Sequence, residues 1–344
     1  MTTQDLPSET MATPQPSPQR VAAIDCGTNS LRLLIADISA DRRELAEVHR
    51  RMEIVRLGQG VDATGALDPA ALARTLDVLE QYAQTIWEAG VTAIRMVATS
   101  AIRDASNAAA FTAGVVAILG VEPEVITGDQ EARLSFTGAT AELARPADAV
   151  PAGALPAGAP PPLPAPYLIV DIGGGSTEFV TGGADAGELA AISTDIGCVR
   201  LTERHLHADP PTPAQVSAAT ADIGAAIDLA AATVAAGAAR TLVGLAGSVT
   251  TVAALALGLT SYDAARIHHA RIPATQVHEV SRRLLSLTSQ ERAALGPVHP
   301  GRADVIGAGA LILDQIVTQL GFAEVVASEH DILDGIAWSL ALHD

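Results

Sequence analysis

Two short stretches of the chain combine a carboxylate, glycines and hydroxyls in the same order. One is DIGGGSTE, residues 171–178, which follows the apolar run YLIV. The other is DCGTNS, residues 25–30, which follows the apolar run VAAI. A turn of this composition brings backbone N–H groups and short hydroxyl donors close to a ligand, and it can hold phosphate oxygens without a lysine. The chemistry to expect is therefore recognition of phosphate.

The carboxylate that opens each stretch needs its own explanation, because an aspartate and a phosphate repel each other. Asp25 and Asp171 make sense if a divalent cation, or a water molecule held on one, lies between the carboxylate and the phosphate. Taken singly, either stretch is explained about as well by a structural hairpin turn in which the aspartate caps the backbone. The matched pair favours a site.

The match between the two stretches extends beyond their polar residues. Each is preceded and followed by an apolar run, so that residues 21–37 are typical of a strand, a tight turn and a second strand. Two such hairpins far apart predict two halves of similar build, each opening with the same loop. Two loops that face each other would clamp a phosphate chain from both sides. The matched positions are Asp25 with Asp171, Gly27 with Gly173, and Ser30 with Ser176.

Between and after these hairpins, strand patterns alternate with helix patterns. Residues 68–90 carry apolar residues at helical spacing, and residues 91–107 indicate a buried strand, a polar turn and a helix start. A strand, a break at Gly128 and a helix from about Asp129 follow. Such alternation indicates an α/β fold. In the second half we expect a strand and glycine turn at 241–251 and helices at 213–239, 273–287, 302–320 and 330–342.

Composition sets the expected boundaries between domains. Residues 1–20 are rich in Pro, Ser, Thr and Gln and predict a disordered tail. We expect an N-terminal domain over residues 21–130 and a C-terminal domain over residues 131–344. Within the latter, residues 145–166 are dominated by Pro, Ala and Gly, which predicts a solvated insertion loop without chemistry of its own.

The overall composition excludes several classes of function. All 21 basic residues are arginine, which excludes a Walker-type phosphate loop, a Schiff-base enzyme and a lysine base. The formal net charge of −18 argues against non-specific nucleic-acid binding. Two cysteines, Cys26 and Cys198, give neither a disulfide framework nor a zinc site. No apolar run reaches the roughly 18 residues of a membrane span and no signal-peptide pattern opens the chain, so we expect a cytoplasmic protein that binds neither membrane nor nucleic acid.

Other chemical candidates depend on local hints alone. Arg103 follows a strand and can pair with a phosphate through two parallel bonds, although pairing with the adjacent Asp104 explains it equally well. Glu131 lies in the first turn of an expected helix, where the helix dipole favours acidic residues whatever the function. The turn at 244–251 is a third one with glycines and hydroxyls. None of the nine histidines has the spacing of a zinc site.

Seven stretches of the chain occur in an order that resembles a known family. They are AAIDCGTNSLRLLIAD, ATSAIRDASN, GDQEARLSFTGA, VDIGGGSTEF, GLAGSVTT, RADVIGAGALIL and SEHDILDGIAWSL, within residues 21–342. Together they are similar to the exopolyphosphatase / guanosine pentaphosphate phosphohydrolase (Ppx/GppA) family of the actin-like ATPase superfamily. The resemblance implies two ribonuclease H-like α/β domains that flank a cleft, and it places the chain in the short, two-domain subgroup.

The resemblance also implies roles for individual residues. Glu131 occupies the second acidic place of the family's Gly-x-Glu-Glu-Ala-Arg pattern and would be the catalytic base, whereas Gln130 departs from the first. Asp171 would orient the attacking water or hold Mg²⁺ (or Mn²⁺), with Asp25 and Glu178 as further metal ligands. Arg103 would pair with a phosphate. The residues that would cradle the phosphates are Gly27, Thr28, Asn29, Ser30, Gly173, Gly174, Gly175, Ser176 and Thr177.

The implied activity is hydrolysis of the terminal phosphate of inorganic polyphosphate, and three alternatives stay open. The first is a pppGpp 5'-phosphohydrolase, which performs the same chemistry on another phosphate tail. The second is an actin-like kinase, against which the Glu131 pattern argues, and the third is a non-catalytic sensor of phosphorylated ligands. A homodimer is an expectation drawn from the family alone. Because the short subgroup lacks extra C-terminal domains, we expect a preference for shorter polyphosphate chains.

Overall fold

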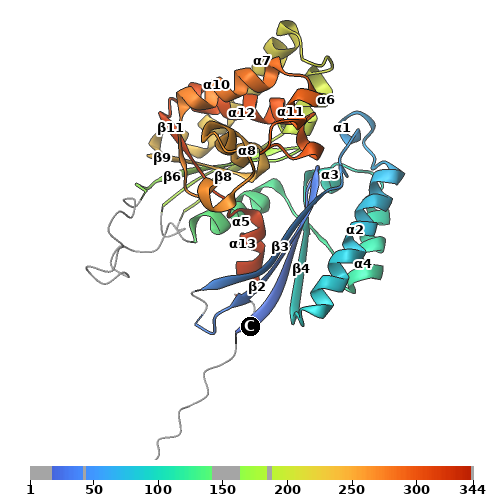
Figure 1. Ribbon diagram of the computed structural model, residues 1–344. Helices are drawn as coiled ribbons and strands as arrows, with labels where there is room; N and C mark the ends of the chain where they lie inside the picture. Colours follow the sequence, from blue (N-terminus) through green and yellow to red (C-terminus); the bar gives the residue numbers. More distant parts are fainter. Residues whose placement is uncertain (1–17, 42–43, 142–162, 184–187, 342–344) are drawn as a thin grey trace, which may run out of the picture.

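The computed structural model describes residues 18–41, 44–141, 163–183 and 188–341. Each half of the described chain forms one β-sheet with helices on its faces (Figure 1). The first sheet has the strand order β3-β2-β1-β4-β5, and the second has the order β10-β11-β9-β6-β7-β8. The run β8-β7-β6-β9-β11 repeats the order of the first sheet, and β10 is an added edge strand. The predicted α/β class is confirmed.

The elements of the first half alternate much as the sequence predicts. The strands are β1 Gln19–Cys26, β2 Ser30–Ile38, β3 Leu45–Ile54, β4 Ala93–Ala98 and β5 Glu124–Val125. The helices are α1 Val61–Thr64, α2 Pro69–Glu88, α3 Ser100–Arg103, α4 Ala108–Leu119 and α5 Gly128–Thr140.

The second half repeats this plan with more helices. Its strands are β6 Tyr167–Ile172, β7 Thr177–Gly182, β8 Ala190–Thr194, β9 Thr241–Leu245, β10 Arg271–Pro273 and β11 Glu324–Ala327. Its α-helices are α6 Cys198–His205, α7 Pro213–Val234, α8 Ala246–Ala256, α9 Ala264–Ile267, α10 Ala274–Ser286, α11 Ser289–Ala293, α12 Ile306–Gln319 and α13 Ile332–Leu340. Short 3-10 helices cover Ala236–Ala238 and Pro300–Arg302.

Both halves open with the same hairpin, which confirms the internal repeat. The turn between β1 and β2 is closed by a bond from Gly27 N to Ser30 O at 3.0 Å, and the turn between β6 and β7 by a bond from Gly173 N to Ser176 O at 3.0 Å. In each hairpin the aspartate has a charged partner directly opposite on the next strand. That partner is Arg32 opposite Asp25 and Glu178 opposite Asp171.

Helix α5 begins where its sequence provides a complete cap. The Thr127 hydroxyl accepts a bond from Gln130 N at 3.3 Å, and the Gln130 side chain accepts one from Thr127 N at 2.9 Å. This reciprocal capping box satisfies two N–H groups that the helix leaves unpaired. The departure at Gln130 therefore has a structural account, because glutamine and glutamate serve equally in this role. The cap fixes the start of the helix at Gly128, three residues before Glu131.

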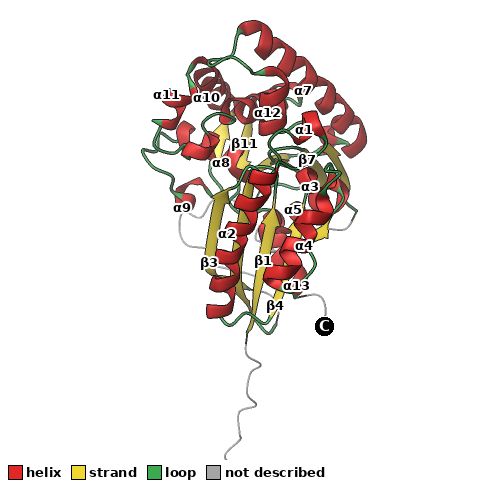
Figure 2. Ribbon diagram, turned by 90° about the vertical axis from the view of Figure 1, so that its right-hand side faces the viewer, coloured by secondary structure: helices red, strands yellow, loops and turns green. Residues whose placement is uncertain are grey.

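Helices α2 and α4 cover one face of the first sheet, side by side (Figure 2). The opposite face is covered by α13, whose Ile332, Ile336 and Ala337 pack on Val21 and Leu34 of β1 and β2. Helix α5 packs instead on the second sheet, through Phe136 and its neighbours. The chain therefore returns to the first sheet at its end. The division at residue 130 stays a prediction, and the structure adds that α13, within residues 131–344, packs on the first sheet.

Helices α5 and α13 cross at two glycines between the sheets (Figure 1). A Cβ atom built on Gly138 would lie 1.8 Å from Asp331 O, and one on Gly335 would lie 2.0 Å from Leu134 O. No real side chain fits at such distances from backbone atoms. The close crossing is what allows α5 to carry Glu131 into the space between the two sheets.

Replacement of Gly138 by alanine is expected to destabilise the protein by about 1–3 kcal/mol, because the new methyl group pushes α13 away from α5. Urea unfolding followed by circular dichroism measures this change. The matched control is Gly237→Ala, since a Cβ atom at Gly237 meets no atom within 4 Å. Equal unfolding midpoints for the two variants would show that the helix crossing accommodates a methyl group at residue 138.

The structure corrects where the expected disordered tail ends. Gln19 and Arg20, which composition placed in a disordered tail, are the first residues of β1 and pair with Ile38 and Asp37. Arg20 also binds Asp37 through two hydrogen bonds of 2.8 Å. The rest of that tail, up to residue 17, and residues 145–162 of the expected insertion lie outside the described residues.

Within the described part of the chain, α7 is the one helix that is long and apolar enough to cross a membrane by length and composition. One helix of this kind is weak evidence, because helices of soluble proteins pass the same test. Here α7 begins with a capping box at Thr212. It packs on the hydrophobic core of the second half through Ile223, Ile227 and Val234.

Candidate functional site

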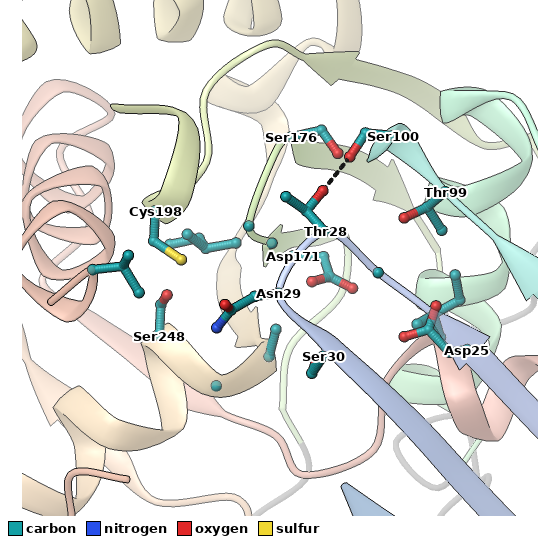
Figure 3. Close-up of a pocket in the computed structure, with 18 of the residues that line it drawn as sticks. Asp25, Thr28, Asn29, Ser30, Thr99, Ser100, Asp171, Ser176, Cys198 and Ser248 are labelled. Carbon is teal, nitrogen blue, oxygen red and sulfur yellow. Dashed lines mark hydrogen bonds between the residues drawn. The ribbon is translucent and has the colours of Figure 1, made fainter. Parts of the chain in front are cut away.

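A polar chamber of about 80 Å³ lies where the two hairpin turns meet (Figure 3). The ends of β1 and β6 bring the turns together, and the starts of α5 and α8 close the chamber. Ten of the residues predicted as functional line it, so the structure brings most of the predicted site together. They are Asp25, Gly27, Thr28, Asn29, Ser30, Glu131, Asp171, Gly173, Gly174 and Ser176.

The two turns approach each other closely because the second one consists of glycine. A Cβ atom on Gly174 would lie 2.9 Å from Thr28 Cβ, and one on Gly175 would lie 2.7 Å from Thr28 Oγ1. Thr28 and Ser100 share a hydrogen bond of 2.9 Å between their hydroxyls, as Figure 3 shows. Side chains at these glycines would force the two halves apart. The glycines therefore let the turns meet and leave their backbone N–H groups accessible.

Asp171 ends β6 at the floor of the chamber and is almost fully buried. The Ser135 hydroxyl of α5 donates to its Oδ2 at 2.7 Å. Burial, and then repulsion from Asp331, raises the pKa of Asp171 to about 7. A carboxyl group with this pKa is partly protonated at neutral pH unless a cation joins it.

Glu131 reaches the chamber from the first turn of α5 and is also buried. Burial raises the pKa of its carboxyl group well above the ordinary value, and repulsion from Glu178 adds to the shift. Arg103 opposes it, with Nη1 3.3 Å from Glu131 Oε2 and 2.9 Å from Ile126 O. The result is a carboxyl group of increased basicity that one arginine orients, and in its ionised form it can accept a proton.

Asp25 shares a partly buried arginine, Arg32, with the last described helix. Arg32 binds Asp25 Oδ2 through two bonds of 2.7 and 2.9 Å and also binds Asp331, the N-cap of α13. Burial is the main cause that raises the pKa of Asp25, and the ion pair with Arg32 opposes it. Asp25 Oδ1 is buried and has no hydrogen-bond partner among the residues that the structure describes. One oxygen at the chamber wall is thus left available to a ligand.

Arg302 is a functional candidate that the sequence did not reveal. Its guanidinium lines the chamber and also a larger cavity of about 510 Å³ next to it, with Arg32, Ala246 and Gly247 shared by both. Burial is the main cause that lowers the pKa of Arg302, and the charge of Asp331 opposes it. A Cβ atom on Gly247 would lie 1.4 Å from Arg302 Nη1, so a side chain there would displace the guanidinium. The turn at 244–251 is the signal that pointed toward this place.

Four predicted residues do not line the chamber. Arg103 is turned toward Glu131, and Gly175 faces the side away from the chamber, where Arg200 donates to its carbonyl at 2.7 Å. The Thr177 hydroxyl donates to Ile196 O at 2.6 Å. Glu178 is buried behind Asp171 and accepts a bond from Ser193 at 2.7 Å. The family resemblance placed Gly175 and Thr177 in the phosphate cradle and Glu178 on the metal. In the structure the Thr177 hydroxyl is bonded to Ile196 O and the Glu178 carboxyl to Ser193.

The donor set at the chamber suits a hard divalent cation. The unpartnered Asp25 Oδ1 and the carboxylate of Asp171 are oxygen ligands of the kind that Mg²⁺ prefers. Among the described residues, no three His, Cys, Asp or Glu side chains are grouped closely enough to hold one ion. Mg²⁺ usually takes only one or two carboxylates and completes its shell with water and substrate phosphate. The residues therefore fit such an ion, which Asp25 and Asp171 would hold, and Glu178 does not line the chamber.

The buried carboxyl groups predict how stability depends on pH. Burial is the chief cause that raises the pKa of Asp171 to about 7 and the pKa of Glu178 to about 8. The folded protein keeps protons that the unfolded chain releases near pH 4, so this stabilisation is full below about pH 4 and is lost as the pH rises through about 8. We expect the melting temperature of the metal-free protein to fall between about pH 5 and pH 8. Glu178→Gln should flatten that fall, and an unchanged slope would contradict the assignment.

The sequence matches a family model described as the Ppx/GppA phosphatase family over residues 34–150 and 162–343. It is 50% identical over 333 residues to Exopolyphosphatase 2 of Mycobacterium tuberculosis, which covers 94% of this chain and 98% of that protein.

Solved structures show the same architecture. A crystal structure described as an exopolyphosphatase-like protein is 41% identical, with a TM-score of 0.84 over 94% of this chain and 99% of that one. The Aquifex aeolicus member of the Ppx/GppA family is 32% identical, with a TM-score of 0.74 over 94% of this chain and 98% of that one. The predicted pair of ribonuclease H-like domains is confirmed by this likeness. The match spans nearly all of both chains in each case.

Proposed function

The chain belongs to the Ppx/GppA phosphatase family, and from this premise we propose that it is an exopolyphosphatase. It would hydrolyse the terminal phosphate of inorganic polyphosphate and release orthophosphate. The observation that carries the proposal is the position of Glu131, a buried carboxylate held by Arg103 at a chamber walled by two phosphate-type turns. The relative named Exopolyphosphatase 2 supports the choice of substrate.

Each group of residues has a part in the proposed reaction. N–H groups and hydroxyls of the two turns, from Thr28, Ser30 and Ser176 among others, hold the terminal phosphate. Glu131 accepts a proton from water as the water oxygen forms a bond to the terminal phosphorus. The bridging P–O bond breaks, and the electron pair leaves with the shortened chain. Arg103 keeps Glu131 oriented and favours its ionised form.

A divalent cation fits this scheme as a proposed cofactor. Asp25 and Asp171 would hold it, and when bound it would offset the negative charge of the phosphates and of the leaving chain. Asp171 also accepts a bond from Ser135 on α5, the helix that carries Glu131. The position of Asp171 is therefore linked to that of the base.

Hydrolysis of pppGpp is the second candidate function, and the larger cavity is the observation that favours it. At about 510 Å³ the cavity has room for more than a phosphate chain. Its wall combines arginines with apolar surfaces from Met52, Pro297 and Val298. A nucleoside would find both apolar contact and hydrogen-bond donors there. Because the chamber would act on the same phosphoanhydride bond in either case, only substrate comparison separates the two.

Phosphate release from polyphosphate and from pppGpp, measured with Mg²⁺ for the wild type and for Glu131→Ala, tests the proposal. We expect a higher kcat/KM on polyphosphate and loss of activity on both substrates in the variant. ADP formation from ATP in the presence of an acceptor, without release of phosphate from polyphosphate, would instead identify a kinase. Binding of polyphosphate without turnover would identify a sensor.

Among polyphosphates of defined length, kcat/KM is expected to rise over short chains and then level off. The described residues that line the larger cavity include Arg32, Arg50, Arg51 and Arg302, and beyond them the formal net charge of −18 offers a long polyanion little attraction. A steady rise of kcat/KM with chain length would contradict this expectation and would indicate a longer cationic track.

A further inference from the structure

The two halves are joined at one edge of the chamber by a group of ion pairs that the proposed chemistry leaves unused. Helix α6 of the second half carries Arg200 and Arg204, and it lies beside α1 and α3 of the first half (Figure 1). Arg200 donates to Asp62 at 2.7 Å and to Asp104 at 2.6 Å. Arg204 binds both oxygens of Asp62, at 2.7 and 2.9 Å. We refer to these four side chains as the clasp.

The clasp is continuous with the second phosphate turn. Arg200 Nε donates to Gly175 O at 2.7 Å, so one guanidinium contacts the turn and both carboxylates of the first half. Its side chain is only 12% exposed. Next to it, Gly60 N donates to Glu203 at 3.0 Å, which adds a further bond between the halves. Two-pronged and charge-assisted bonds of this kind fix geometry more firmly than single contacts do.

The chamber is flanked by spaces of very different size, one near Arg302 and one near Arg200. Toward the clasp, behind Thr28 and Gly175, the remaining space is about 10 Å³. Away from the clasp, the chamber shares Arg32, Gly247 and Arg302 with the cavity of about 510 Å³. A phosphate chain therefore has room to enter from the larger cavity, and it has no room to leave past Thr28 and Gly175 while the halves stay together.

We propose that the clasp closes this end of the cleft, so that the chamber admits a phosphate chain only by its end. The inference rests on the proposed function and adds to it a structural cause for terminal cleavage. A chain that enters from the larger cavity stops with its last phosphate between the two turns. Hydrolysis of an internal bond would require the chain to run through the chamber, which needs the clasp to open.

The test compares a linear polyphosphate of defined length with the same chain blocked at both ends as phosphoramidates. Terminal hydrolysis releases orthophosphate, whereas internal hydrolysis of a blocked chain gives two shorter chains that a gel resolves. For the wild type we expect kcat/KM on the open chain to exceed that on the blocked chain by at least about 100-fold. In Asp62→Ala/Asp104→Ala, the kcat/KM on the blocked chain should rise by about tenfold.

A second measurement reports on the clasp without relying on catalysis. Spin labels at Thr64→Cys and His207→Cys, both exposed, flank the clasp from the two halves. The native Cys26 and Cys198 are buried, with thiol pKa values raised chiefly by burial, and should stay unlabelled. With the clasp intact, we expect one narrow distribution of distances between the two spin labels. In Asp62→Ala/Asp104→Ala, that distribution should shift to longer distances and become broader. Glu324→Ala is the matched control, because it removes the partner of Arg271 within the second half only.

Each outcome decides the proposal. A distance distribution that the double variant leaves unchanged overturns the clasp, whatever the activity. A distance that lengthens while the blocked chain stays uncleaved overturns the link to end recognition, and rapid cleavage of the blocked chain by the wild type does the same. If the wild type cleaves neither chain, the proposed function fails, and the distances alone decide whether the clasp closes this edge.

Discussion

Replacement of Glu131 by glutamine is expected to lower kcat for phosphate release by on the order of 10²–10⁴-fold, with KM changed little. Glutamine keeps the size of the side chain and its contact with Arg103, but it accepts no proton from water. KM should hold because the two turns, rather than Glu131, grip the phosphates. Steady-state phosphate release on a short polyphosphate measures both constants.

The matched control for this substitution lies on the same helix. Asp129 stands two residues earlier in α5, is exposed and pairs with Arg133 at 2.8 Å, so Asp129→Asn should keep the wild-type rate. Stability offers a second readout. Removal of a buried carboxyl group that Glu178 repels should leave the unfolding midpoint of Glu131→Gln unchanged or raised. A variant as fast as the wild type would place the base elsewhere, with Asp171 the next group to replace.

The sequence sufficed to predict the two hairpins and their pairing. The repeated order of aspartate, glycine and serine fixes a strand end, a turn and a backbone bond, all of which are local properties. Asp25 and Asp171 accordingly stand at equivalent places in the two sheets. Glu131 required the family resemblance, because an acidic residue in a first helical turn has an ordinary explanation in the helix dipole.

What the sequence did not predict depends on contacts between distant segments. Arg32 is held between Asp25 and Asp331. Asp25 is 7 residues away from Arg32 in the sequence, whereas Asp331 is 299 residues away. Arg302 reaches the chamber past Gly247 of α8, where a Cβ atom would meet its guanidinium. Thr177 shows the opposite failure. Its place in the motif suggested phosphate binding, but pairing of β7 with its neighbours commits the hydroxyl to Ile196.

Removal of divalent cations is expected to abolish phosphate release, with a loss of at least ~100-fold. Asp25, Glu131 and Asp171 line the chamber, and Glu178 and Asp331 lie behind them. Arg32, Arg103 and Arg302 face this group, and Arg50 adds its charge beside Asp331. A phosphate chain adds further negative charge, so binding without an added cation is strongly opposed. Phosphate release with excess chelator, and then with Mg²⁺ or Mn²⁺ restored, measures the effect.

Binding of the ion can also be followed apart from activity. With a pKa of about 7, Asp171 is partly protonated at neutral pH, so a cation that binds it must displace that proton. Titration calorimetry with Mg²⁺ in buffers of different ionisation enthalpy should show proton release, and Asp171→Asn should lose it. Sodium or potassium should not replace Mg²⁺, because a single charge leaves the carboxylates and phosphates in excess. A chelated enzyme that retains its full rate would show that Arg32, Arg103 and Arg302 offset the charge alone, and the aspartates at the ends of β1 and β6 would then need a different role.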